Sequence, residues 1–168
     1  FLAAGLGTRM RPLSLTTPKP LIPVAGKALM EHILDEAVAA GIERIVVNVH
    51  YLPEQVEAHL ASKTGLDVIL SDEREELLET GGAIVKARDL LGDEPIFVIN
   101  TDAFWVNAAT NPFEDLNRAY NPDTMDDLLL LAARSRSLGF DGMGDFDLLP
   151  DGRVERRGDR PETPWAYA

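Results

Sequence analysis

Cysteine is absent from the 168 residues of this sequence. A disulfide framework, a zinc–thiolate site and a cysteine nucleophile are therefore excluded. Long apolar runs are lacking too: none reaches the ~18 residues of a membrane span, and no signal peptide is visible. The length suits one domain with a substantial core. These features predict a soluble, cytoplasmic protein without a membrane partner.

Acidic side chains are absent from residues 1–30, although the whole chain carries a net charge of −12. This opening segment has a charge of +4, contributed by Arg9, Arg11, Lys19 and Lys27. The rest of the chain has 28 acidic and 12 basic residues. Such asymmetry argues against a nucleic-acid partner, which needs a broad basic face. It favours a small anionic ligand held by a focused cationic patch, with chance clustering of solvated bases as the alternative.

Strand-like and helix-like stretches alternate along the first hundred residues. Strands are predicted over 1–4, 44–50, 66–73 and 95–100, and helices over 29–40, from Pro53 onward and over 80–92. This alternation predicts an α/β fold, a three-layer sandwich whose mostly parallel central sheet is covered on both faces. Ligands in such folds bind outside the carboxyl ends of the strands. The glycine loop after the first strand, His50, the end of the third strand and Asp102 all fall there.

The alternation weakens after residue 110. A helix is predicted over 113–120, a strand over 127–133 and a hairpin over 146–155, turning at Pro150-Asp151-Gly152. No internal repeat or long linker divides the chain, so residues 1–168 are expected to form a single domain.

The stretch "AGLGTRMRP" resembles two phosphate-binding motifs but matches neither. Gly5 and Gly7 fit G-x-G-x-x-G, but Met10 occupies the third glycine position, and the spacing of a Walker loop also fails. What remains is a loop whose glycines let backbone N–H groups approach a ligand closely. Arg9 and Arg11 can bind phosphate oxygens. The prolines that follow stiffen the segment that carries Lys19. A loop with these glycines and cations suits the triphosphate of a nucleotide. The alternative is a surface turn with solvated bases.

The stretches "LAAGLGTRMRPLS" and "TPKPLIPVAGKAL" resemble the signature of the sugar-1-phosphate nucleotidyltransferases. Members of this family have a Rossmann-like fold and join a nucleoside triphosphate to a sugar 1-phosphate, releasing pyrophosphate. "NVHYLPEQVEAHL", "LLETGGAIVKA" and "GFDGMGDF" are most similar to bacterial N-acetylmuramate-1-phosphate uridylyltransferases of peptidoglycan recycling. The implied partners are UTP and N-acetylmuramate 1-phosphate. Alternatives are a mannose-1-phosphate guanylyltransferase, a glucose-1-phosphate thymidylyl- or uridylyltransferase, and a regulatory homologue that senses nucleotide sugars.

The resemblance also implies roles for residues of the opening segment. Arg9 would contact the β- and γ-phosphates, and Lys19 would bridge the α-phosphate and the sugar phosphate, making these two the catalytic residues. The nucleotide contacts would come from Ala3, Ala4, Gly5, Gly7 and Thr8, and from Thr80, Gly81 and Gly82. The sugar would lie near Asp141, Gly142, Gly144 and Asp145.

Asp102 matches the family's magnesium-binding aspartate, so Mg²⁺ is the expected cofactor. Here the chain has Asn100-Thr101-Asp102, whereas the family usually has Gly or Ala at the middle position. Magnesium prefers carboxylate and phosphate oxygens. The attacking sugar phosphate is already anionic, so no general base is required. Glu79, His50 and Trp105 could reach the ligand or serve only local structure.

The family holds magnesium with two aspartates, and the second would follow a strand that comes just after "PWAYA". The chain ends at Ala168 and lacks an initiator methionine. It is therefore expected to be clipped at its N-terminus and to lack its C-terminal part.

Overall fold

The computed structural model describes residues 1–106 and 110–167. The chain forms two compact units, residues 1–108 and 109–168. The first contains β1 (Pro23–Val24), β2 (Lys27–Ala28), α1 (Leu29–Ala39), β3 (Arg44–Val49), α2 (Pro53–Ala61), β4 (Asp67–Asp72), α3 (Thr80–Lys86) and α4 (Arg88–Leu91). The second contains α5 (Pro112–Ala119), β5 (Leu131–Ala133), β6 (Phe146–Leu148), β7 (Val154–Arg156) and β8 (Trp165–Tyr167). Within the described ranges, no helix has the length and apolar character to cross a membrane.

Parallel pairing organises the first unit. β3 and β4 pair in parallel from Arg44↔Asp67 to Val49↔Asp72. Leu2 forms parallel bridges to both Asn48 and Asn100, so the opening segment lies between β3 and the segment that ends at residue 100. The chain therefore brings the carboxyl ends of four segments to one edge, as the alternation of strands and helices predicted.

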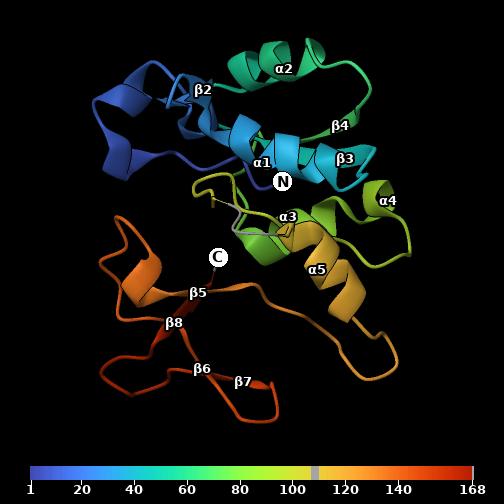
Figure 1. The fold of residues 1–168 in the computed structure, drawn as a ribbon. Helices are drawn as coiled ribbons and strands as arrows, with labels where there is room; N and C mark the ends of the chain where they lie inside the picture. The colour runs from blue at the N-terminus through green and yellow to red at the C-terminus, as the bar shows by residue number, and fades with distance from the viewer. Residues whose placement is uncertain (107–109, 168) are drawn as a thin grey trace. The chain divides into compact units, whose positions relative to one another are not determined.

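The core of this unit follows from the alternation of side chains along β3. Its residues Ile45, Val47 and Val49 are buried in one cluster with apolar residues of α1 and α2, namely Met30, Leu34, Val56 and Leu60. Val46, which alternates with them, lines a small cavity together with Ala83 and Ala87. Helices thus cover β3 from both sides, with α1 and α2 opposite α3 (Figure 1).

Other sequence predictions are met only in part. Among the described strands, β3 and β4 form the only parallel ladder. The β1–β2 pair and the four-stranded sheet of the second unit are antiparallel, so strand pairing is mostly antiparallel and not mostly parallel as predicted. The stretch 95–100, predicted as a strand, is not a named strand: it has a parallel bridge from Asn100 to Leu2, and the Ile99 carbonyl accepts a hydrogen bond from the Leu2 amide at 2.8 Å. The predicted helix over 80–92 is interrupted at Ala87, which separates α3 from α4.

The second unit is built around an antiparallel sheet with the order β5-β8-β6-β7. The predicted hairpin is confirmed as β6 and β7, with Gly152 at a φ of 87° in the turn. α5 confirms the helix predicted there; the Asn111 side chain caps it by accepting a hydrogen bond from the Phe113 amide at 2.9 Å. The strand predicted over 127–133 is shorter, and β8 was not predicted.

Candidate active site

A cavity of about 340 Å³ opens at the carboxyl edge of the first unit. Five separate stretches of chain line it: residues 2–10, Lys19 and Pro20, Asn48, residues 77–80 and residues 100–102. The lining combines backbone of the glycine loop with two cationic side chains, Arg9 and Lys19, and two carboxylates, Glu79 and Asp102. Such a mixed, cation-bearing lining suits an anionic ligand.

The glycine loop is held in place by local hydrogen bonds. Gly7 adopts a φ of +60°, and its carbonyl accepts a hydrogen bond from the Ser14 hydroxyl at 2.6 Å. The Tyr51 hydroxyl in turn donates to the Ser14 carbonyl at 2.9 Å. A Cβ at position 7 would lie 3.1 Å from the Ser14 Cβ and 3.2 Å from the Lys19 Cβ. Both the left-handed backbone conformation and the close approach of Ser14 and Lys19 therefore favour glycine at position 7.

Gly7→Ala is expected to lower kcat about tenfold, because the added methyl displaces Lys19 from its position by a few tenths of an ångström. Steady-state kinetics at saturating substrates measures the effect. Gly26→Ala is the matched control: Gly26 has a φ of +82° but an added Cβ would meet nothing within 4 Å, and it lies outside the cavity. Equal kcat losses in both variants would mean that backbone strain, rather than contact with Lys19, is responsible.

Lys19 and Asp102 form an ion pair at the cavity wall. The Lys19 ammonium donates to the Asp102 carboxylate at 2.9 Å, and the two side chains are 21% and 46% exposed. The neighbouring Thr101 is buried, and its hydroxyl donates to the Leu2 carbonyl at 2.8 Å. The Thr101 side chain thus connects the loop that carries Asp102 to the opening segment. Lys19 and Asp102, the predicted catalytic and metal-binding residues, are brought together from opposite ends of the unit.

Arg9 lies at the cavity with its charge uncompensated. It is exposed, and within the part of the chain that the structure describes no carboxylate lies within ion-pair distance of it. In a chain with an excess of acidic residues, a cation left without a partner is available to an anionic ligand. Arg11 is also exposed but is not among the lining residues.

Asp102 could serve as one ligand of a divalent cation. It is half exposed at the cavity, and carboxylate oxygen is a donor that magnesium prefers. Within residues 1–106 and 110–167, no cluster of three or more histidine or acidic side chains could hold a metal by itself. The donor set therefore fits a cation that is held jointly by Asp102, ligand oxygens and water.

Most of the predicted nucleotide contacts line this one cavity. They are Ala3, Ala4, Gly5, Gly7, Thr8 and Thr80. Gly81 and Gly82 follow Thr80 in α3 but are not among the lining residues. Glu79 does line the cavity, whereas His50 and Trp105 do not. The Nδ1–H of His50 donates to the Glu73 carbonyl at 2.6 Å, which gives it a local structural role.

The predicted sugar contacts Asp141, Gly142, Gly144 and Asp145 belong to the second unit. There the Asp145 carboxylate accepts a hydrogen bond from the Tyr167 amide at 3.0 Å. Gly144 has a φ of +80°, and a Cβ there would come within 2.2 Å of the Thr163 carbonyl oxygen. Both residues thus have structural reasons for their identity within this unit, and their contact with sugar stays a prediction.

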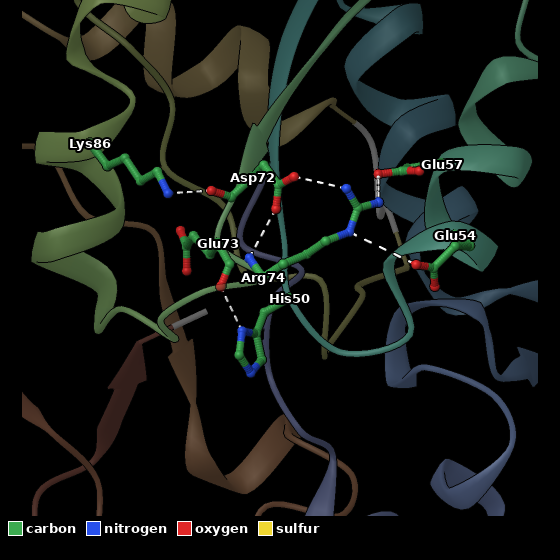
Figure 2. A network of polar contacts seen from close by, with 7 residues as sticks. All are labelled: His50, Glu54, Glu57, Asp72, Glu73, Arg74 and Lys86. Atoms are coloured by element: carbon green, nitrogen blue, oxygen red, sulfur yellow. Dashed lines mark hydrogen bonds and ion pairs between the residues drawn. The ribbon is translucent and has the colours of Figure 1, made fainter.

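Two buried polar residues at the cavity, Asn48 and Glu73, are not predicted from the sequence. Asn48 lies inside an apolar strand, and Glu73 lies at the start of an acidic run; both are buried, at 7% and 0% exposure. Figure 2 shows Glu73 within a network of polar contacts, flanked by Asp72 and Arg74. An amide within a β-branched run was the available signal for Asn48. Nothing in the sequence distinguished Glu73 from the solvated acids that follow it.

Comparison with known proteins connects this site to a family. The sequence profile described as nucleotidyl transferase matches residues 1–164. The chain belongs to the nucleotidyl transferase family. It is 48% identical over 99% of its length to N-acetylmuramate alpha-1-phosphate uridylyltransferase of Caulobacter vibrioides, covering 70% of that protein. It is 39% identical over 97% of its length to the protein of the same name in Neisseria meningitidis, covering 67%.

More distant nucleotidyl transferases share part of the chain. A mannose-1-phosphate guanyltransferase of Gibberella zeae is 42% identical over 69% of this chain, which spans 32% of that protein. Among solved structures, HddC from Yersinia pseudotuberculosis, complexed with GMP-PN, has a TM-score of 0.71 over 99% of this chain and 71% of its own, at 23% identity. That likeness supports the fold, a mixed α/β nucleotidyltransferase fold.

Proposed function

We propose that this protein is a uridylyltransferase that joins UTP and N-acetylmuramate 1-phosphate to give the UDP-sugar and pyrophosphate. The observation that carries the proposal is the 48% identity, over 99% of this chain, to the Caulobacter uridylyltransferase. The cavity agrees with the reaction, because its glycine loop and two cations suit a triphosphate. The proposal includes a Rossmann-like, three-layer arrangement, supported by helices on both sides of β3.

In the proposed reaction, an oxygen of the sugar phosphate attacks the α-phosphorus of UTP. The bond from the α-phosphorus to the oxygen bridging to the β-phosphate breaks, and pyrophosphate leaves with that oxygen. Charge develops on the leaving pyrophosphate, and positioned cations stabilise it. Arg9 would bind the β- and γ-phosphates, while Lys19 would hold the α-phosphate and the sugar phosphate together. Backbone amides of the loop around Gly7 would bind phosphate oxygens.

A bound magnesium ion would neutralise phosphate charge and polarise the α-phosphate. Asp102 is the residue that we propose to hold it. The Lys19 ammonium, which now neutralises the Asp102 carboxylate at 2.9 Å, would then be released to the ligand phosphates. The remaining ligands would come from phosphate oxygens and water, since Asp102 supplies only one side of an octahedron.

A second candidate is transfer of GMP to mannose 1-phosphate. The observation in its favour is the 42% identity to the Gibberella guanyltransferase over 69% of this chain. The two candidates share the opening signature and the chemistry at phosphate, so they differ only in base and sugar recognition.

Incubation of the purified protein with paired substrates tests the proposal. UTP, GTP, CTP and dTTP are each combined with N-acetylmuramate 1-phosphate, mannose 1-phosphate or glucose 1-phosphate, and pyrophosphate release is measured with Mg²⁺ present. We expect the highest kcat/KM for UTP with N-acetylmuramate 1-phosphate. A preference for GTP with mannose 1-phosphate would support the second candidate instead. Binding of a UDP-sugar without turnover of any pair would indicate a sensing protein and contradict the proposal.

A further inference from the structure

Glu73 is a fully buried carboxylate that the proposed reaction does not use. It follows directly after β4 and has 0% exposure. Across the described residues, no lysine or arginine lies within ion-pair distance of it. Its Oε1 accepts a hydrogen bond from the Asn48 side-chain amide at 2.9 Å, and its Oε2 accepts one from the Leu78 backbone amide at 3.2 Å. Burying a carboxylate costs free energy unless such bonds satisfy it.

Asn48 extends these contacts to the glycine loop. Its Oδ1 accepts a hydrogen bond from the Ala3 backbone amide at 2.6 Å. A continuous chain of hydrogen bonds therefore runs from Ala3 through Asn48 to Glu73, where Leu78 joins from the other side. Ala3, Asn48 and Leu78 all line the cavity. Glu73 thus connects two walls of the cavity from behind: the segment that leads into Gly5 and the segment that leads into Thr80.

The backbone on both sides of Glu73 is anchored as well (Figure 2). The Asp72 carboxylate accepts hydrogen bonds from the Arg74 amide at 2.9 Å and from its guanidinium at 2.8 Å. The bond from the Arg74 amide is the main cause that lowers the pKa of the Asp72 carboxyl. Arg74 also pairs with Glu57 of α2, and the Lys86 ammonium of α3 donates to the Asp72 carbonyl. These contacts join the residues on either side of Glu73 to α2 and α3, and so position the backbone from which its side chain reaches Asn48 and Leu78.

We propose that Glu73 is a positioning residue that fixes the spacing between the glycine loop and residues 77–80. The inference rests on the proposed function, because both walls include predicted nucleotide contacts, among them Ala3, Gly5 and Thr80. Asn48 has a definite polarity in this arrangement: its oxygen faces an N–H, and its N–H₂ faces a carboxylate. Two donors converge on Glu73, one from each wall, so only a group with two acceptor oxygens satisfies both.

Exchanging the two side-chain types tests the proposal. In Glu73→Gln the new N–H₂ must face either Asn48 or the Leu78 amide, so one donor meets another donor. In Asn48→Asp a second carboxylate faces Glu73. In the double variant Glu73→Gln with Asn48→Asp every bond is restored: the carboxylate at position 48 accepts from Ala3 and from the amide at position 73, whose oxygen accepts from Leu78. The net charge of the pair is also unchanged.

We expect each single variant to lower kcat/KM for the triphosphate about tenfold or more, and the double variant to recover to within about threefold of the wild type. Hydrogen–deuterium exchange of the ligand-free protein should be faster at residues 1–7 and 75–80 in both single variants, and normal in the double. Glu31→Gln is the matched control, because Glu31 is another buried glutamate, bonded to His59 and Lys63 away from the cavity. Its exchange at these two segments and its kcat/KM should stay at wild-type values.

A folded double variant whose kcat/KM stays as low as in the single variants would overturn the proposal, as would single variants with wild-type exchange in both segments. If Glu73→Gln fails to fold, the double variant is compared with Asn48→Asp alone, and the same recovery of kcat/KM is expected. The exchange measurement needs no substrate. A wild-type protein that turns over no triphosphate would therefore contradict the proposed function, while the exchange pattern would still test the role of Glu73.

Discussion

Lys19→Ala is expected to lower kcat by about 100-fold or more while leaving the unfolding temperature nearly unchanged. The ammonium lines the cavity beside Asp102, where it would stabilise charge on the reacting phosphates. Removal leaves the Asp102 carboxylate without this partner, but that side chain is 46% exposed and water replaces the bond. Ion pairs of this kind contribute only about 0–1 kcal/mol to stability. Kinetics and thermal unfolding on the same preparation separate the two effects.

Lys27→Ala is the matched control for this change. Lys27 belongs to the same cationic segment and pairs with an aspartate, Asp35, but it does not line the cavity. Its kcat should stay within about twofold of the wild type, since a distant surface charge is screened. If Lys19→Ala retained wild-type turnover, Lys19 would have no catalytic role.

Arg9→Ala is expected to weaken binding of the nucleoside triphosphate about 10- to 100-fold, because a charge-assisted hydrogen bond to the terminal phosphates is lost. Binding of the free sugar phosphate should change less than threefold, since the proposed contact of Arg9 is with the β- and γ-phosphates. Isothermal titration with each ligand separately measures both affinities. Stability should not fall, because Arg9 is exposed and has no ion-pair partner among the described residues.

Arg11→Ala provides the comparison at almost the same place in the chain. Arg11 is exposed but does not line the cavity, so its removal tests the general charge of the segment. A similar loss of triphosphate affinity in both variants would mean that the general positive charge of the segment attracts the triphosphate, and that Arg9 makes no specific contact with it. Equal losses of both ligands in Arg9→Ala would place this side chain elsewhere in the site.

The elements that sequence predicted well are those whose burial shows in local periodicity. The β-branched run of β3 and the helical spacing of Ile33, Leu34 and Ala37 reflect contacts with a core that any packed arrangement would need. β8 escaped prediction because its stability comes from strands far away in the sequence, with Leu131↔Tyr167 as one pairing. A three-residue strand has too little pattern of its own to be distinguished from a loop.

The residues of the candidate site also differ in how well the sequence predicts them. Residues that we propose to contact the ligand through backbone or charge, such as Gly7, Arg9 and Lys19, stand out in the sequence because the glycines and cations gather in a segment that has no acidic residue. The burial of Glu73 could not be predicted, because the sequence of an acidic run does not show which of its glutamates is buried and which is solvated. Only the three-dimensional positions of Asn48 and Leu78 reveal that its two oxygens are both occupied.

The bridges of Leu2 have a consequence for the order in which the protein folds. The cavity walls are joined by contacts far apart along the chain: 45 residues between Ala3 and Asn48, and 99 between Leu2 and Thr101. Closing such loops lowers the entropy of the chain before the stabilising contacts can form. These pairings therefore form slowly compared with helices. We therefore expect the cavity to form among the last steps of folding. A ligand that binds there stabilises only the finished state, and so slows unfolding rather than speeding collapse.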